Sequence, residues 1–408
     1  MCRTFLGKGK KIAKILISSL GTGRKQDNGY REATYEYKGQ KEKSTFISKS
    51  LSKMLDIDKL FIVGTNGSIW DSCYKQFGGE DEDIELELFG KIEEKNITEI
   101  DLEIVNQTIS AKLNSEGSKC FLIDYGLNEE ELWGNFDKYI QILDKVEDGD
   151  TIYIDISHAF RSLALMSFLM IQFGHGIKNK KFNIGGIYYG MLEATKNEIT
   201  PIVDLKIFYD LMEWIKAIDA FKNYGHADLL VKLFDSEKNI KSQTSDTFNQ
   251  FDINLSMANM SALRSFIDNA KRVLPVMEKS NNHIVRLISP DILDFIKRLD
   301  KPKISDFQLE LAKWFYDNTN YALSYIILVE ALVTKECELM NINIHDKDTR
   351  NRAKNSLYST SDEIKKTYKS IAGIRNNIAH QKESSSDTIK DVENLKEYII
   401  EVTRYCKK

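Results

Sequence analysis

The first half of the chain alternates short apolar runs of strand length with segments of helical period. The strand-like runs cover residues 14–20, 59–63, 119–124, 151–156 and 185–189. Runs of this length, bounded by glycine and polar turn residues, are typical of buried strands. Because helical segments separate several of them, we expect an α/β domain with a parallel, doubly wound sheet.

From about residue 204 onward, apolar residues recur at helical spacing instead. The first helix of this part is expected to present one apolar face, formed by Leu205, Phe208, Leu211, Met212, Ile215 and Ile218. Further helices are predicted over residues 320–340, 362–380 and 386–405. The second half of the chain is therefore predicted to be all-α.

Glycine usage changes at the same place, since every glycine except Gly373 lies at or before Gly225. Tight turns and loops that approach a ligand need glycine, whereas helical bundles do not. We expect three parts: an α/β domain over 1–205, a helical connector over 206–303 and a helical domain over 304–408.

Two local patterns give more specific expectations in the second half. The stretch 235–252 is rich in Ser, Thr, Asn and Gln, which predicts a flexible loop with weak order. Ser305 followed by Gln308 has the spacing of a capping box at the start of a helix. Glu330 and Glu336 are expected on solvated faces or between helices.

Size and charge limit the possible functions. A chain of 408 residues with 42% hydrophobic content is too long for one core and normally forms two or more domains. Its formal net charge of −4 argues against coating nucleic acid by bulk electrostatics. Any RNA binding is therefore expected at a small, focused site.

The cysteines and the start of the chain indicate a cytoplasmic protein. Cys2, Cys73, Cys120, Cys337 and Cys406 are scattered, without the spacing of a zinc site, and are expected to be reduced and structural. The lysine-rich start is followed by a strand-length run and no cleavage-like site, so no signal peptide is predicted. No apolar stretch reaches membrane-spanning length.

Loops that follow predicted strands carry the first chemical signal. Open parallel sheets bind ligands at the carboxyl ends of their strands. The loop Leu20, Gly21, Thr22 and Gly23 offers closely approaching backbone amides and a hydroxyl group. A second loop contains Thr65, Asn66 and Gly67, which a plain turn explains equally well. Neither matches a dinucleotide fingerprint or a P-loop, which excludes these two nucleotide-binding classes.

The third loop follows the predicted strand 151–156 and runs into a helix. Its Asp155, Ser157, His158, Arg161 and Ser162 gather at the positive end of that helix, a favourable place for an anionic ligand. In the alternative interpretation, Ser157 only caps the helix and Arg161 pairs with Asp155.

The strand after this helix ends at Gly190 and Met191, and a glycine at that point leaves room for a pocket. This strand end completes the set of candidate ligand-binding residues in the first half of the chain.

A second chemical signal lies near the C-terminus, where Arg375 and His380 are five residues apart in a predicted helix. Such positions lie about 140° apart around the axis and within two turns, so both side chains can reach one phosphodiester. The arginine can hold phosphate oxygens, and the histidine can move protons at neutral pH. Asn376 and Asn377 add further phosphate donors. Alternatively, the pair occurs by chance, and both side chains only interact favourably with the negative C-terminal end of the helix dipole.

These motifs together resemble the CRISPR-associated CARF-HEPN ribonucleases, the accessory effectors of type III CRISPR systems. The resemblance rests on LGTG at residues 20–23, DISHAFRS at 155–162, IYYG at 187–190 and RNNIAH at 375–380. It implies a Rossmann-like CARF domain in the first part of the chain, followed by a helical HEPN ribonuclease domain. No motif was matched to the middle region, residues 236–303.

The resemblance also implies an activity and its control. A homodimer would bind a cyclic oligoadenylate across its two-fold axis, with a four-adenylate ring favoured over six, and the sequence leaves open a higher oligomer. Two copies would then form one site that cuts single-stranded RNA without a metal or other cofactor. His380 would transfer protons, Arg375 would stabilise the transition state and Asn376 would position the phosphate. The products would carry a 2′,3′-cyclic phosphate and a 5′-hydroxyl.

Two alternatives remain open from the sequence. One is a non-enzymatic regulator in which nucleotide sensing controls a partner or transcription through the helical half. The other is a ribonuclease without ligand control, against which the glycine-rich loops and Arg161 argue. Ser157 and His158 are also candidates for slow degradation of the activator by the sensor itself.

Overall fold

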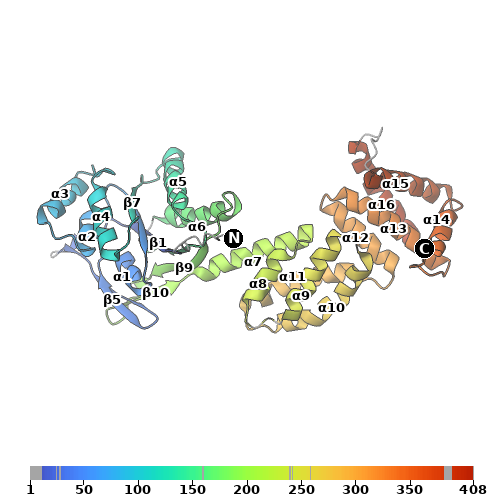
Figure 1. Ribbon diagram of the computed structural model, residues 1–408, viewed down its shortest axis with the longest axis horizontal. Coiled ribbons are helices and arrows are strands. Elements are labelled where there is room, and N and C mark those ends of the chain that lie inside the picture. The colour runs from blue at the N-terminus through green and yellow to red at the C-terminus, as the bar shows by residue number, and fades with distance from the viewer. Residues whose placement is uncertain are drawn as a thin grey trace, which may run out of the picture. The chain divides into compact units, whose positions relative to one another are not determined.

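The computed structural model describes residues 12–23, 25–26, 29–158, 160–238, 240, 242–257, 259–380 and 388–407. The chain forms two compact units, the first ending at Asp210 and the second beginning at Leu211 (Figure 1). The lysine-rich start with Cys2, and Ala159 in the third loop, lie outside the described residues.

The first unit is an α/β domain. Its strands are β1 (Lys14–Leu20), β2 (Lys25–Gln26), β3 (Gly29–Tyr30), β4 (Ala33–Tyr37), β5 (Gln40–Ser44), β6 (Lys59–Gly64), β7 (Lys119–Leu122), β8 (Thr151–Asp155), β9 (Asn183–Gly190) and β10 (Ile199–Asp204). Its helices are α1 (Ile47–Met54), α2 (Trp70–Gln76), α3 (Glu82–Glu93), α4 (Leu102–Leu113), α5 (Glu129–Asp144), α6 (Arg161–Gly176) and the short 3-10 helix η1 (Leu192–Ala194).

The main sheet has the strand order β5-β4-β10-β9-β8-β1-β6-β7. The five strands expected from the sequence are present and form its parallel part, with Ile15 opposite Lys59 of β6 and Lys14 opposite Thr151 of β8. Strands β10, β4 and β5 were not predicted, and they extend the sheet through an antiparallel pairing of β10 with β9. The expected α/β class is therefore confirmed.

Alternation along β1 explains why helices cover both faces of this sheet. Ile15 and Ile17 belong to a buried cluster with residues of α5 and α6, whereas Leu16 and Leu20 belong to a second cluster with residues of α1, α2 and α4. Successive strand residues point to opposite faces, so a strand that is apolar throughout must be covered on both sides. Figure 1 shows these two groups of helices around the strands.

The second unit consists of helices in the part that the structure describes, as expected. They are α7 (Lys206–Tyr224, which begins in the first unit), α8 (Asp228–Ser236), α9 (Ser242–Ser256), α10 (Met260–Glu278), α11 (His283–Leu299), α12 (Ile304–Asp317), α13 (Tyr321–Leu339), α14 (Lys347–Leu357), α15 (Asp362–His380) and α16 (Thr388–Cys406). Helix α13 packs against α12, α14, α15 and α16. One buried apolar cluster extends from Trp214 to Cys406.

The prediction of a flexible loop over residues 235–252 is wrong. Apart from residues 239 and 241, which lie outside the described part, this stretch contains the end of α8 and most of α9. Phe248, Phe251 and Leu255 lie at helical spacing and are buried. Three large apolar side chains on one face are enough to fix a helix whose other positions are polar, because tertiary packing overrides propensity.

The predicted apolar face of α7 is also wrong in part. Phe208 and Ile215 are exposed, while Trp214, Ala217 and Phe221 form the buried face. The ring of Phe221 meets those of Phe248, Phe251 and Phe295 at centroid distances of 5.3, 5.3 and 4.9 Å. Aromatic packing therefore selects a face that counting aliphatic residues does not reveal.

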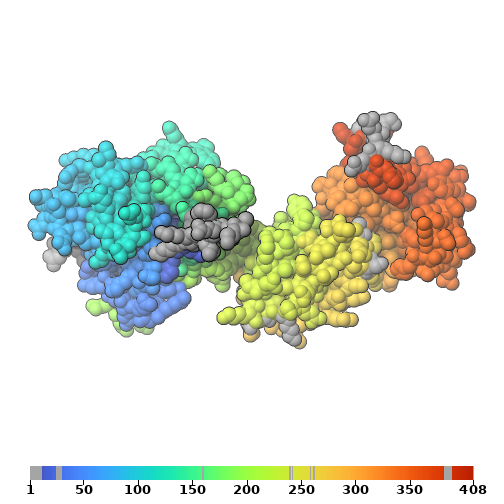
Figure 2. All heavy atoms as spheres, in the orientation of Figure 1, coloured from blue at the N-terminus to red at the C-terminus, as the bar shows by residue number. Residues whose placement is uncertain are grey.

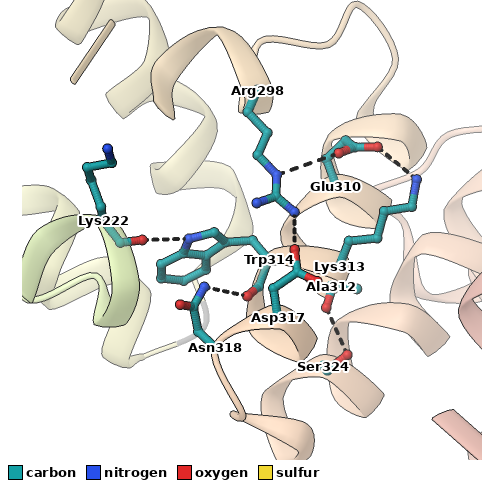
Figure 3. Close-up of polar contacts among 9 residues, drawn as sticks. All are labelled: Lys222, Arg298, Glu310, Ala312, Lys313, Trp314, Asp317, Asn318 and Ser324. Carbon is teal, nitrogen blue, oxygen red and sulfur yellow. Dashed lines mark hydrogen bonds and ion pairs between the residues drawn. The ribbon is translucent and has the colours of Figure 1, made fainter. Parts of the chain in front are cut away.

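Helix α12 is joined to its neighbours by polar contacts as well (Figure 3). The indole nitrogen of Trp314 donates to the carbonyl oxygen of Lys222 in α7 at 2.9 Å. Arg298 of α11 lies 2.7 Å from an oxygen of Asp317 and 3.9 Å from one of Glu310. The helices of residues 211–303 are thereby bonded to those that follow.

The capping box predicted at Ser305 and Gln308 is absent. Helix α12 begins at Ile304, and its N-cap residue Lys303 makes no side-chain cap. Ser305 instead donates to the carboxylate of Glu338 through its amide at 3.1 Å and its hydroxyl at 2.6 Å. A glutamate from α13 thus binds the start of α12, and no sequence pattern within α12 reveals it.

The remaining expectations concern cysteines, metals and membranes. Cys73, Cys120, Cys337 and Cys406 are buried and free, as expected. No group of three or more His, Cys, Asp or Glu side chains in the described residues is placed to hold a metal ion. Among the described helices, none combines the length and the apolar character needed to cross a membrane.

Candidate functional site

A cavity of about 460 Å³ lies at the carboxyl ends of β1, β6 and β8. Strand β1 stands between β6 and β8 in the sheet, so the chain leaves β1 toward one side and later returns on the other. This reversal is the position at which doubly wound sheets bind their ligands. The walls are formed by Leu20, Gly21, Thr22, Gly23, Tyr30, Arg31, Ala33, Tyr35, Thr45, Gly64, Thr65, Ser68, Ile123, His158, Phe160, Leu163, Leu192 and Glu193.

Six of the ligand-binding residues predicted from the sequence line this cavity: Leu20, Gly21, Thr22, Gly23, Thr65 and His158. They come from three separate loops, which the fold brings together. The other predicted residues, which are Asn66, Gly67, Asp155, Ser157, Arg161, Ser162, Gly190 and Met191, are not among its walls. Their role in ligand binding stays a prediction.

The first loop is held by its carbonyl groups. The carbonyl oxygen of Leu20 accepts a hydrogen bond from the Ser68 hydroxyl at 2.7 Å, and that of Gly21 accepts one from the amide of Ile69 at 3.1 Å. Gly23 has a φ of +67°, and a Cβ there would lie 2.7 Å from a ring carbon of Tyr30. Glycine is therefore required for both the backbone conformation and the space.

The loop after β6 is fixed by Ser68 and Trp70. The amide of Thr65 donates to the Ser68 hydroxyl at 2.9 Å, and the Trp70 indole donates to the Thr65 carbonyl at 2.8 Å. Asn66 instead donates to the carbonyl of Lys95 at 2.8 Å. Only the first residue of the predicted triplet therefore faces the cavity.

The carboxylate of Asp155 holds the third loop in place through hydrogen bonds. It is buried, and its carboxylate accepts hydrogen bonds from the hydroxyl of Ser18 at 2.6 Å and from the amide and hydroxyl of Ser157 at 2.9 and 2.5 Å. Burial raises the pKa of Asp155. The capping role suggested for Ser157 is thus replaced by bonds to Asp155 and to Gly190, whose amide donates to the Ser157 hydroxyl at 2.7 Å.

His158 reaches the cavity beside the first loop. A Cβ at Gly21 would lie 3.3 Å from the Cβ of His158, so the two loops are in close contact. The Nε2 atom of His158 lies 3.5 Å from the hydroxyl of Tyr35. Burial lowers the pKa of His158, although the carboxylate of Asp155 acts in the opposite direction. We therefore expect a neutral imidazole at pH 7.

Two charged residues that line the cavity were not predicted from the sequence. Arg31 and Glu193 are among the walls, and Arg31 is exposed. Arg161, the cation predicted for this site, is the exposed first residue of α6. A sequence signal did exist for Tyr35, because the Lys38–Gly39 pair lies between two segments of strand length, which is the pattern of a β-hairpin turn. Both turn residues have positive φ in the structure.

The predicted catalytic residues lie together at the end of α15. Arg375 is partly buried, with Nη2 4.0 Å from an oxygen of Glu330, whereas Asn376 and His380 are exposed. His380 is the last residue of the helix. Atoms of the red C-terminal helices are visible at the surface in Figure 2. An arginine, an amide and an imidazole at an exposed helix end can contact a phosphodiester.

Comparisons with known proteins bear on both halves of the chain. A family model described as the CARF domain of the CRISPR system endoribonuclease Csx1 matches residues 15–193. A model described as the second domain of the CRISPR-associated protein MJ1674 matches residues 210–307. The second match covers all of residues 236–303, the region for which no sequence motif was found.

A curated protein and a solved structure are also similar. The CRISPR-associated protein MJ1674 of Methanocaldococcus jannaschii is 32% identical over 404 residues, a match that covers 90% of this chain and 62% of that protein. The chain thus spans about three fifths of the length of this relative. A structure of Enterococcus italicus Csm6 bound to cyclic hexa-2′-fluoro-hexa-dAMP is 12% identical, with coverage of 97% and 94% and a TM-score of 0.43. A TM-score below 0.5 does not establish a shared fold.

The matched CARF region contains every strand that borders the cavity, and the MJ1674 similarity extends through the helical half. The observed parallel sheet followed by helices agrees with this assignment. Residues 15–193 are therefore similar to a CARF domain, residues 210–307 to the second domain of MJ1674, and most of the chain to this CRISPR-associated relative.

Proposed function

We propose that the chain is a cyclic oligoadenylate-activated endoribonuclease of type III CRISPR defence. The observation that carries the proposal is the position of the cavity, since its walls come from strand ends within the residues that match a CARF domain. Backbone loops with glycine, hydroxyl groups and one arginine are suited to phosphates and riboses. The start of α6 beside His158 adds a favourable electrostatic field for anions.

The size of the cavity supports a homodimer. A volume of about 460 Å³ is typical of pockets for drug-sized ligands. A ring of four or six adenylates is larger, so it would extend beyond one cavity, and a second copy would supply the other half. A ligand with rotational symmetry suits a pocket built from two identical halves.

The proposed cleavage uses groups on α15. The 2′-hydroxyl of the RNA attacks the adjacent phosphorus, and the 5′-oxygen of the next nucleotide leaves. His380 of one copy removes the proton and His380 of the other protonates the leaving oxygen, while Arg375 stabilises the phosphorane charge and Asn376 holds the phosphate. The RNA itself supplies the nucleophile, so the proposal includes no metal.

Activation requires that the ring bind one dimer arrangement better than another. A ligand shifts an equilibrium only by its differential affinity for the two states. In the proposal, binding at the strand ends favours the arrangement in which both copies of α15 meet around one RNA strand. Degradation of the ring by Ser157 and His158 is an additional possibility that the same assays address.

The test is RNA cleavage by the purified chain with cyclic tetra-adenylate, cyclic hexa-adenylate or no ring, each with and without EDTA. We expect ring-dependent cleavage that EDTA does not abolish, stronger with the four-adenylate ring. End-group analysis should show a 2′,3′-cyclic phosphate and a 5′-hydroxyl. Tight ring binding without any RNA cleavage would instead support a non-enzymatic regulator.

A further inference from the structure

One carboxylate in the second unit is shared by two arginines. Glu330 of α13 accepts a hydrogen bond from Nη2 of Arg350 in α14 through Oε2, and its Oε1 atom lies 4.0 Å from Nη2 of Arg375 in α15. The three residues come from three consecutive helices. No sequence motif relates them, and Glu330 was expected from the sequence only on a solvated or inter-helix face.

In this cluster, the contact between Glu330 and Arg350 is the more rigid of the two. Arg350 also donates to the hydroxyl of Thr334 at 3.2 Å and to the carbonyl oxygen of Ile344 at 3.0 Å. Only 18% of its side chain is exposed. An arginine with three acceptors has little freedom to move, so it holds the Glu330 carboxylate in a defined orientation.

The contact between Glu330 and Arg375 is looser. Its distance of 4.0 Å is an ion-pair distance rather than that of a hydrogen bond, and 27% of the Arg375 side chain is exposed. Arg375 therefore retains donors for another acceptor. Two guanidinium groups and one carboxylate leave a net charge of +1, so the cluster as a whole still attracts a phosphate.

We propose that Glu330 is a positioning residue for Arg375: its carboxylate, fixed by Arg350, orients the guanidinium toward the scissile phosphate of the RNA. This inference rests on the proposed ribonuclease function and adds a residue to it. A partly exposed ion pair adds little to stability, so the Glu330 charge can be removed without unfolding the protein. Its effect is expected in the chemical step, because a small misplacement of a catalytic group slows a reaction strongly.

The experiment uses the full chain with its activating ring and measures kcat and KM for RNA cleavage. For Glu330→Gln, which keeps the shape and an acceptor for Arg350, we expect kcat to fall about 10- to 100-fold with little change in KM. Glu330→Asp keeps the charge and should recover part of the loss. In an Arg375→Ala background, Glu330→Gln should have no further effect, because it acts through Arg375.

Glu310→Gln is the matched control. Glu310 is also a partly exposed glutamate of the helical unit that lies near an arginine, Arg298, and a lysine, Lys313 (Figure 3). This variant should cleave RNA at the wild-type rate. Thermal unfolding of all variants shows whether they fold, and if Glu330→Gln does not, the comparison of Glu330→Asp in wild-type and Arg375→Ala backgrounds decides instead.

Two failures can be told apart. If the wild-type chain does not cleave RNA with any ring, the proposed function is wrong and this inference falls with it. If the wild type cleaves and Arg375→Ala cleaves much more slowly, but the Glu330 variants match the wild type, only the role of Glu330 is rejected. Equal losses from Glu330→Gln with and without Arg375 would also reject it, since the effect would then be a general loss of structure.

Discussion

The hydroxyl oxygen of Ser157 accepts a hydrogen bond from the amide of Gly190 at 2.7 Å, and so joins the loop after β8 to the end of β9. The same hydroxyl donates to Asp155. A Cβ at Gly190 would lie 3.3 Å from this oxygen and 2.6 Å from the side chain of Ile47. The serine and the glycine, which are far apart in the sequence, therefore fix the backbone next to His158 together.

Ser157→Ala should weaken both stability and ring binding. It leaves the buried Asp155 without one donor and the Gly190 amide without its acceptor, at a cost of about 1–3 kcal/mol in free energy of unfolding. Urea denaturation and a binding titration with cyclic tetra-adenylate measure the two effects. A variant with wild-type stability would show that the two hydrogen bonds contribute nothing.

The pH dependence of stability should reveal the buried His158. Its pKa is lowered in the folded chain, so below about pH 6.5 the unfolded state binds a proton that the folded state does not. The contribution of His158 is therefore present above that pH and is lost as the pH falls. The wild type should lose stability relative to His158→Asn between pH 7.5 and pH 5.5, as measured by urea denaturation. A constant difference would contradict a depressed pKa.

Arg31 and Arg161 should differ in their effect on the activator. Arg31 lines the cavity, so Arg31→Ala should raise the Kd for the ring roughly 10- to 100-fold, the usual consequence of losing a charged hydrogen bond. Arg161→Ala, at the start of α6, should weaken activation to a smaller extent. Isothermal titration with each variant measures both. A larger effect at Arg161 would favour the loop predicted from the sequence over the part of the wall that contains Arg31.

His380→Ala should abolish RNA cleavage while ring binding and dimerisation stay unchanged. General acid-base catalysis typically contributes about 10²- to 10⁴-fold to a rate, and this variant lacks both histidines of the paired site. Gel assays of cleavage, with binding measured in parallel, test the prediction. His345→Ala, which changes another exposed histidine of the same unit, serves as the control. Cleavage at the wild-type rate by His380→Ala would remove the nuclease assignment.

A homodimer needs a surface, and α6 presents one candidate. Leu165 and Leu169 lie one turn apart on this helix and are 68% and 56% exposed. If they lie in the dimer interface, Leu165→Glu should give a monomer in light scattering and should lose ring-dependent cleavage. Leu86→Glu on α3, where the leucine is 66% exposed, should remain dimeric. Identical behaviour of the two variants would place the interface elsewhere.

The sequence predicted the parallel part of the sheet well, because its strands are rich in apolar residues and largely buried, as in β1 and β6. Strands β4, β5 and β10 were missed, since residues such as Glu36 and Lys41 make them look like surface segments. Their place in the sheet depends on pairing with β9 through β10, which is a tertiary contact. The part of the cavity wall that Tyr35 of β4 forms was therefore missed with them.

The part of the candidate site that lies in short sequence motifs could be predicted. Leu20 to Gly23 and His158 meet because parallel strands end at one edge of a sheet, which is a rule of topology rather than of any one residue. Glu330 and Arg350 could not be related to Arg375, because helix packing and not spacing brings them together. Residues 235–252 were predicted to be a loop for the same reason, since Phe248 and Phe251 find their partner Phe221 only in the folded chain.

The aromatic packing of α7, α9, α11 and α12 determines where the chain can be cut. A fragment beginning at residue 304 would expose Trp314, whose ring lies 5.7 Å from that of Phe295 and whose indole binds the Lys222 carbonyl. Such a truncation would leave large apolar surfaces open to water and prone to aggregate. The helices from α12 onward are thus inseparable from the segment before them, and an isolated C-terminal fragment must include α7 to remain folded.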